Sequence, residues 1–353
     1  MTTPSESITT CQDASDRNEH DLLEVSDVRV QFKLGRSLPG RPARRVTAVD
    51  GVDLEVAPGE TVALVGESGC GKTTLGRVIA RLQQADEGTI RFRGGDVSAY
   101  RGKQLRDYRS NVQMIFQDPF TSLNPRLTIR DVVSEPLRIN RTDDRSSIDR
   151  RAADLLDAVG IPSRQIDRKS RAFSGGQRQR VAIARALALD PELIVCDEPV
   201  SALDMSVQAR IINLLVDLRQ EFDLAYLFIS HDLGVVRHIA DRVAVMYLGR
   251  IVELGPTDQI FGDPQHPYTR ALLESVPDPY RRLGTPVVRG EVPSNVDVSA
   301  GCSFAPRCDL RMDVCTKQRP PLEPNGSASH VACFAAPPMA TAVSLSERRA
   351  EEG

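Results

Sequence analysis

Gly66-Glu67-Ser68-Gly69-Cys70-Gly71-Lys72-Thr73 is the stretch that decides the fold. It follows an apolar run, Thr61 to Val65, and opens a helical pattern that continues to Leu82. A glycine-rich loop between a strand and a helix can fold closely around a phosphate group, because its N–H groups and the helix N-terminus face the anion. Lys72 adds a positive charge, and Thr73 adds a hydroxyl for Mg²⁺. The sequence therefore predicts a nucleoside triphosphate site formed by Gly66, Glu67, Ser68, Gly69, Cys70, Gly71, Lys72, Thr73 and Thr74.

Two adjacent carboxylates end a second apolar run. Leu193 to Cys196 is typical of a strand buried on both faces of a parallel sheet, and Asp197 and Glu198 follow it directly. At such a strand end one acid can hold Mg²⁺ through water, and the next can polarise an attacking water. We therefore expect Asp197 to serve the metal and Glu198 to act as the base. The alternative is a strand end whose acids only cap a turn.

A second helix start suited to an anion lies before these acids, at Ser174-Gly175-Gly176-Gln177. Ser174 is a good N-cap, and the two glycines let a phosphate approach the exposed N–H groups of the helix that continues to Leu189. The chain thus carries two separate phosphate-binding helix starts.

In this order, the motifs resemble those of the ATP-binding subunits of ABC transporters, in which Ser-Gly-Gly-Gln is the signature motif. The resemblance implies that Gln117 senses Mg²⁺ and the attacking water, and that His231 contacts the γ-phosphate. Asp204 ends Ser201-Ala202-Leu203-Asp204, which matches the loop that crosses to a partner subunit. The expected catalytic residues are Lys72, Gln117, Glu198 and His231, and the expected Mg²⁺ residues are Thr73, Gln117 and Asp197.

The family also has an aromatic ring upstream of the phosphate loop that stacks on adenine. Phe32 is the candidate, because it ends a strand-like run that starts at Leu23. The alternative is a core aromatic at a strand end, and the stretch from Lys33 to Val46 departs from the shortest family pattern. The resemblance further implies that the signature of one subunit, Ser174 to Gln177, closes on ATP held by another.

The fold class predicted is α/β, because strand-like and helical runs alternate along the chain and imply a largely parallel sheet flanked by helices. A helical insert between Gln117 and Ser174 matches the small helical subdomain of the ABC cassette, which also has an antiparallel β part. No internal repeat occurs, so we expect one cassette. The expected divisions are a disordered N-terminus at 1–20, a nucleotide-binding domain at 21–255 with its helical subdomain at about 120–190, a cysteine-containing extension at 256–337 and a disordered tail at 338–353.

Composition limits the classes of partner. The chain has 353 residues, a formal net charge of -3 and no tryptophan. This charge argues against bulk electrostatic binding to nucleic acid. No apolar segment approaches the roughly 18 to 20 residues needed to cross a bilayer, and the N-terminus lacks a secretory pattern. We therefore expect a cytosolic subunit whose membrane pore is made by other chains.

Four cysteines lie close together near the C-terminus, at Cys302, Cys308, Cys315 and Cys333. In a cytosolic chain such a group more often binds metal than forms disulfides. The spacing is looser than in zinc knuckles and differs from that of ferredoxins, so metal binding and chance clustering of buried thiols both stay open.

Three further stretches sharpen the resemblance to the oligopeptide and dipeptide import branch. These are residues 116–125, 266–273 and 301–308, and the similarity spans about 22 to 335. Some members of that branch hold a 4Fe-4S cluster on these cysteines, so we expect iron-sulfur rather than Zn²⁺ beside ATP and Mg²⁺.

The branch implies a peripheral ATPase at the cytoplasmic face of the membrane that energises uptake of di- and oligopeptides. Its expected partners are two permease subunits, a second ABC ATPase that is different rather than identical, and indirectly an extracytoplasmic binding protein. Alternative cargoes are nickel chelates, glutathione or other small solutes.

Rivals from other classes are less well matched. A soluble ABC ATPase for DNA repair or translation usually has two cassettes or coiled-coil insertions, and neither occurs in the sequence. A P-loop kinase or GTPase would not need Ser174 to Gln177.

Overall fold

The computed structural model describes residues 21–34, 44–118, 122–140, 144–275, 300–326 and 328–336. The predicted disordered segments 1–20 and 338–353 lie outside the described residues. None of the described helices combines the length and the apolar character needed to cross a lipid bilayer.

A mixed sheet forms the centre of the molecule, in the order β11-β12-β10-β9-β3-β8-β7-β6. The five strands from β9 to β6 are parallel, whereas β10, β12 and β11 are joined in antiparallel pairs. This confirms the predicted α/β class. The strands are β3 (Thr61–Val65), β6 (Val112–Ile115), β7 (Leu193–Asp197), β8 (Ala225–Ser230), β9 (Arg242–Tyr247), β10 (Arg250–Pro256), β11 (Glu323–Pro324) and β12 (His330–Val331).

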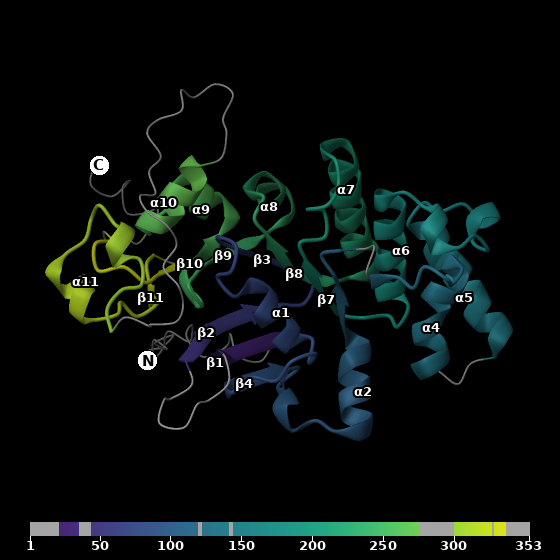
Figure 1. The fold of residues 1–353 in the computed structure, drawn as a ribbon, viewed down its shortest axis with the longest axis horizontal. Helices are drawn as coiled ribbons and strands as arrows, with labels where there is room; N and C mark the ends of the chain where they lie inside the picture. Colours follow the sequence, from purple (N-terminus) through teal and green to yellow (C-terminus); the bar gives the residue numbers. More distant parts are fainter. Residues whose placement is uncertain are drawn as a thin grey trace, which may run out of the picture.

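A second, antiparallel sheet has the order β2-β1-β4-β5. Its strands are β1 (Leu23–Leu34), β2 (Arg44–Val56), β4 (Glu87–Phe92) and β5 (Gly95–Asp96). Its apolar side chains share one core cluster with α1 (Lys72–Ile79) and with strands of the central sheet. Helix α1 therefore lies between the two sheets, as Figure 1 shows. It ends at Ile79 rather than at the predicted Leu82, because Arg81 adopts a left-handed φ of 54° that no helix continues.

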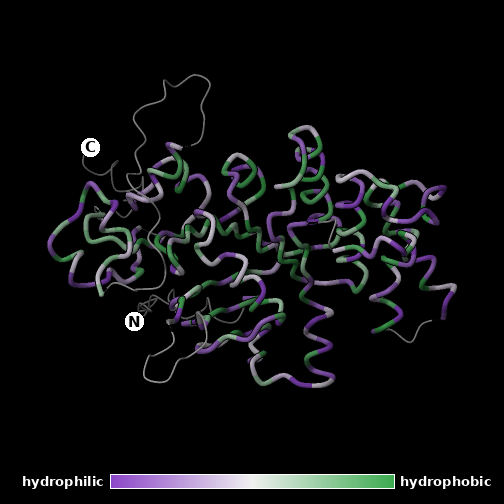
Figure 2. The backbone as a smooth tube through the Cα atoms, viewed as in Figure 1, coloured by the Kyte–Doolittle hydropathy of each residue, from purple (hydrophilic) through white to green (hydrophobic). Residues whose placement is uncertain are grey.

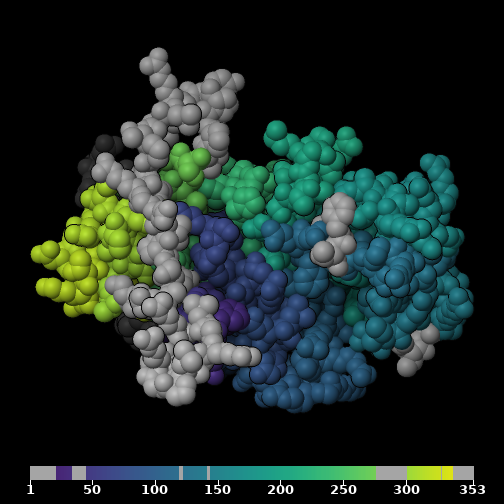
Figure 3. Space-filling model, viewed as in Figure 1, coloured from purple at the N-terminus to yellow at the C-terminus, as the bar shows by residue number. Residues whose placement is uncertain are grey.

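The helical subdomain lies at one end of the molecule (Figures 1 and 3). It is built from α4 (Ile129–Asn140), α5 (Arg145–Ala158) and α6 (Gly175–Leu187). Their facing sides are apolar at helical spacing, and they share a core cluster with α7 (Met205–Phe222). This cluster is separate from the one that supports α1, so the signature helix and the phosphate loop are held by different cores.

The C-terminal extension lies at the opposite end and is joined to the central sheet rather than tethered beside it (Figure 1). Glu253 of β10 pairs with Val331 of β12, which carries the sheet on into the extension. A third cluster combines apolar residues of β3 and β9 with Tyr268 and Phe304. The helices and turns here are α9 (Thr257–Gly262), α10 (Pro267–Glu274), η5 (Ala305–Arg307) and α11 (Asp313–Lys317).

Burial follows hydropathy closely in the central strands. All the residues of β3, β7 and β8 are buried, and Figure 2 shows hydrophobic residues through the middle of the fold. Burying a leucine or valine side chain contributes about 1.5–3 kcal/mol. The strand ends that carry the polar motifs therefore rest on a rigid base. The remaining short elements are η2 (Val97–Ala99), α2 (Gly102–Asn111), η3 (Ser163–Gln165), η4 (Ser170–Ala172) and α8 (Leu233–Ile239).

Candidate nucleotide site

The phosphate-binding loop is wedged between β2 and β9. A Cβ on Gly66 would lie 2.1 Å from the Met246 carbonyl oxygen, and one on Gly71 would lie 2.0 Å from the Ala48 carbonyl oxygen. Their φ angles are 150° and 109°, which side chains of other residues rarely allow. Glycine is therefore required at both positions by backbone contacts as well as by conformation.

Lys72 begins α1 directly after the loop and is buried. Its Nζ donates to the carbonyl oxygens of Gly66 at 2.7 Å and Glu67 at 3.0 Å. Helix α1 has no side-chain N-cap and no acid in its first turn, so its N-terminus can accept a phosphate. Cys70 is buried beside Lys72, and burial raises the pKa of its thiol. Cys70 is thus an uncharged packing residue of the loop.

Thr73 and Asp197 meet, as the sequence predicts for a Mg²⁺ site. The Thr73 hydroxyl donates to Asp197 Oδ1 at 2.8 Å, across 124 positions of sequence. Burial raises the pKa of Asp197, while the Thr73 hydrogen bond opposes that change. A hydroxyl and a carboxylate are oxygen donors of the kind that Mg²⁺ prefers, so these two residues fit the ion.

Glu198 stands next to both of its predicted companions. Gln117 Nε2 donates to Glu198 Oε2 at 2.9 Å, and His231 Nδ1 lies 3.3 Å from the same oxygen. The Glu198 backbone has a φ of 47°, which is strained for a residue other than glycine. A hydrogen bond from the Glu198 N–H to the Ile229 carbonyl oxygen, at 3.0 Å, stabilises this conformation. Such strain is concentrated at functional sites.

The signature residues begin α6. The Ser174 hydroxyl accepts from the Gln177 N–H, and the Gln177 side chain accepts from the Ser174 N–H, which forms a capping box. Gly176 packs against α7, since a Cβ there would lie 2.4 Å from Val207 Cγ1. Asp204 caps α7 by accepting from the Val207 N–H at 3.0 Å. Ser174 and Asp204 are therefore exposed polar caps at the starts of α6 and α7.

Phe32 lies on β1 and is 43% exposed. This exposure contradicts the alternative that it is a core aromatic. Its role in stacking on adenine stays a prediction.

Two residues that touch the phosphate loop were missed in the sequence. The Tyr268 hydroxyl accepts from the Glu67 N–H at 2.8 Å, and Arg307 forms an ion pair with the Glu67 carboxylate. They lie 201 and 240 positions from Glu67, so no local pattern could reveal the contact.

The structure does not support the predicted 4Fe-4S cluster or its Zn²⁺ alternative. Cys302, Cys308, Cys315 and Cys333 line one small cavity, and none of them forms a disulfide. Burial raises the pKa of the Cys302, Cys308 and Cys333 thiols. Within the described ranges, no three or more His, Cys, Asp or Glu side chains are grouped to hold a metal ion. Cys315 is buried and the other three cysteines are half-buried, so the thiols line this cavity without forming a metal-binding group among the described residues.

Family profiles match two parts of the chain. The profile "ABC transporter" matches residues 49–201, and "Oligopeptide/dipeptide transporter, C-terminal region" matches residues 252–315.

Full-length relatives agree with these profiles. The oligopeptide transport ATP-binding protein AppF of Bacillus subtilis is 46% identical over 90% of this chain and 98% of its own length. OppF of Salmonella typhimurium is 45% identical over 90% and 97%, and the dipeptide transport protein DppF of Escherichia coli is 44% identical over 90% and 95%.

Solved structures match the cassette part. A dimeric structure of the ATP-binding cassette MJ0796 with ADP and Pi is 28% identical, with a TM-score of 0.59, over 67% of this chain and 98% of that one. CbiO1 from Clostridium perfringens, part of an ABC transporter complex, is 26% identical, with a TM-score of 0.60, over 69% and 92%.

We expect Glu198→Gln to retain nucleotide binding and to slow hydrolysis by about 10²- to 10⁴-fold, because the amide cannot take a proton from water. Phosphate release and equilibrium nucleotide binding, measured on the same preparation, check this. Glu221→Gln, an exposed change on α7, is the matched control and should behave as wild type. Turnover in Glu198→Gln near the wild-type rate would remove Glu198 from the role of base.

Proposed function

The chain belongs to the ATP-binding subunits of ABC transporters, in their oligopeptide and dipeptide branch, and we propose that its ATPase drives import of di- and oligopeptides through partner permeases. The observation that carries the ATPase role is the convergence on Glu198 of Gln117 at 2.9 Å and His231 at 3.3 Å, beside the Thr73 and Asp197 pair. The C-terminal region that matches the oligopeptide and dipeptide profile supports the choice of cargo.

The residues divide the work of phosphoryl transfer to water. Lys72 and the loop N–H groups hold the phosphates, and Thr73 and Asp197 would hold Mg²⁺, which neutralises the charge that develops on the phosphoryl oxygens. Gln117, which would also reach Mg²⁺, and His231, which would contact the γ-phosphate, lie against the Glu198 carboxylate, which takes the proton of the attacking water. Nearly all of this catalysis is positioning and electrostatic stabilisation, so a small displacement of the loop would lower the rate of hydrolysis strongly.

An open site favours a working unit of two cassettes. The His231 side chain is 60% exposed, and Gln117, Ser174 and Asp204 are also exposed. Catalysis of this kind works best in a water-excluded site, and a single chain leaves these groups in solvent. We propose that Ser174 to Gln177 of one subunit covers ATP on the other. The MJ0796 cassette is a dimer in its structure with ADP and Pi, which supports the proposal.

The partners proposed are two permease subunits, an extracytoplasmic binding protein and a second, different ABC ATPase. The names of AppF, OppF and DppF describe ATP-binding proteins of peptide transport. We place the chain at the cytoplasmic face of the membrane as a peripheral subunit. Nickel chelate, glutathione or another small solute is the alternative cargo, and a soluble ABC ATPase is the second alternative, against which the matched C-terminal region weighs.

We expect Ser174→Arg to slow ATP hydrolysis by at least about 10²-fold, while the affinity of the same chain for ATP stays within about threefold of the wild-type value. The bulky side chain blocks the start of α6, where the partner's triphosphate would lie, and leaves the chain's own loop untouched. Ser163→Arg, an exposed change in the same subdomain, is the control. Full hydrolysis by a strictly monomeric Ser174→Arg chain would refute the shared site.

We expect Lys72→Ala to reduce uptake of labelled dipeptide to background, because the loop loses the charge that holds the phosphates. The variant should still copurify in detergent with two multispanning subunits. Unchanged peptide uptake with loss of another solute would reassign the cargo. Failure of the wild-type chain to copurify with any membrane protein would favour the soluble alternative.

A further inference from the structure

The C-terminal extension grips the phosphate-binding loop through Glu67. Arg307, at the end of η5, donates two parallel hydrogen bonds to this carboxylate, Nη1 to Oε2 and Nη2 to Oε1, each at 2.9 Å. The Arg307 side chain is 6% exposed and that of Glu67 25%. The pKa of Arg307 is raised, chiefly by its hydrogen bond to Glu67. Bidentate charged pairs are among the strongest and most directional hydrogen bonds in proteins.

The backbone of Glu67 is also held on both sides. Its N–H donates to the Tyr268 hydroxyl of α10 at 2.8 Å, and its carbonyl oxygen accepts from Lys72 Nζ at 3.0 Å. One residue therefore connects the extension to the ammonium group that binds phosphate.

Arg307 rests on a rigid aromatic base. Tyr247 lies 4.6 Å from Tyr268 and 5.3 Å from Phe304, measured between ring centroids. The Arg307 guanidinium lies 5.8 Å from the centre of the Tyr247 ring and donates to its hydroxyl at 3.3 Å. The guanidinium is thus held by two residues, Glu67 and Tyr247, which suits a positioning role better than a flexible surface contact would.

The negative charge of Glu67 gives the ion pair with Arg307 a function in ATP binding. A carboxylate in a loop that binds a triphosphate repels its ligand, and the partly buried setting screens that repulsion less than water would. Arg307 supplies the compensating charge at hydrogen-bonding distance.

We infer that Arg307 is a positioning residue for ATP, which neutralises and holds Glu67 so that the phosphate loop accepts a triphosphate. The inference rests on the proposed ATPase function. It gives the extension a role in the ATP site of its own chain, beside any role in contacts with partners.

A purely mechanical fastening of the extension is the competing explanation, and the two differ in the sign of one effect. If Glu67 repels ATP, Glu67→Gln leaves the Arg307 charge uncompensated and strengthens binding. If the pair only fastens the extension, the same change loosens the loop and weakens binding.

The test is equilibrium binding of a fluorescent ATP analogue to the full chain, with thermal unfolding of each variant. We expect Arg307→Gln to raise the Kd by about tenfold, within the usual range of coupling between sites. Glu67→Gln should lower the Kd by about threefold, and the double variant should return to within about threefold of wild type. In the assembled transporter, Arg307→Gln should raise KM for ATP with little change in kcat, because it removes binding rather than chemistry.

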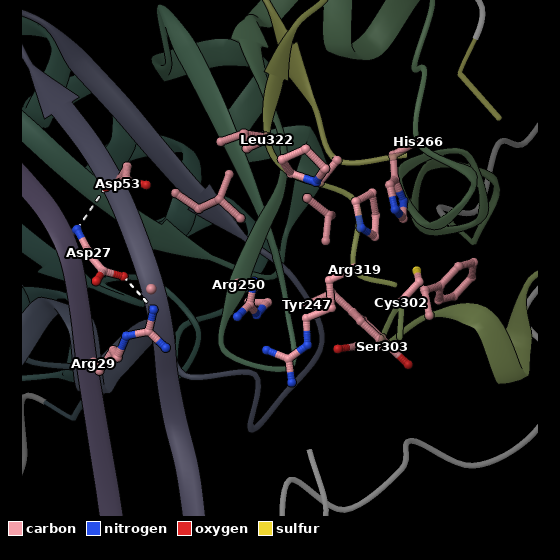
Figure 4. A pocket seen from close by; sticks show the side chains of 17 residues that line it. Asp27, Arg29, Asp53, Tyr247, Arg250, His266, Cys302, Ser303, Arg319 and Leu322 are labelled. Atoms are coloured by element: carbon pink, nitrogen blue, oxygen red, sulfur yellow. Dashed lines mark hydrogen bonds and ion pairs between the residues drawn. The ribbon is translucent and has the colours of Figure 1, made fainter. Parts of the chain in front are cut away.

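Arg319→Gln is the matched control. Arg319 also joins the extension to the cassette, through Asp50 at 3.0 Å, but beside the cavity shown in Figure 4 rather than at the phosphate loop. In this variant Asp50 still forms ion pairs with Arg29 and Arg250, so its negative charge stays compensated. We expect wild-type ATP affinity in this variant.

The inference is overturned if Arg307→Gln binds the ATP analogue with wild-type affinity, or if the double variant binds it as weakly as Arg307→Gln. Either result leaves the proposed function standing. If Arg307→Gln does not fold, the sign of the change in Glu67→Gln decides: tighter binding supports the inference and weaker binding overturns it. A wild-type chain that binds no ATP would overturn the proposed function and the inference with it.

Discussion

The close approach of the phosphate loop to two neighbouring backbones is the constraint on which the site depends. Gly66 lies against the Met246 carbonyl of β9, and Gly71 lies against the Ala48 carbonyl of β2. Any Cβ there would force the loop away from Met246 and Ala48, which are both buried. The loop is therefore held in one conformation before any anion binds, and such preorganisation is what electrostatic catalysis requires.

The carboxylates around this loop differ in their burial and in their hydrogen-bond partners. Asp197 is buried and tied to Thr73, whereas Glu198 stands at a strained strand end between Gln117 and His231. One acid is placed to hold Mg²⁺ and the other to meet water. Glu67 is a third acid, in the loop itself, and it is compensated by Arg307 from the far end of the chain.

The C-terminal extension is part of the cassette's sheet and core. Its β12 pairs with β10, and Phe304 packs with Tyr247 and Tyr268. This explains how a region beyond the nucleotide motifs can act on them. The four cysteines line a small cavity in the same region.

The sequence by itself determined the local chemistry of this protein. The phosphate loop, the Asp197 and Glu198 strand end, the Ser174 cap and the alternation of strands and helices are all encoded within short windows, where spacing and hydropathy limit the backbone to few conformations. Only the tertiary structure decided which distant residues meet: Thr73 with Asp197, Glu198 with Gln117 and His231, and Glu67 with Arg307. Among the described residues it does not support the metal cluster that the cysteine pattern suggested. The physical reason is that a contact across 240 residues depends on how the sheets and helices pack, and local sequence carries no record of that packing.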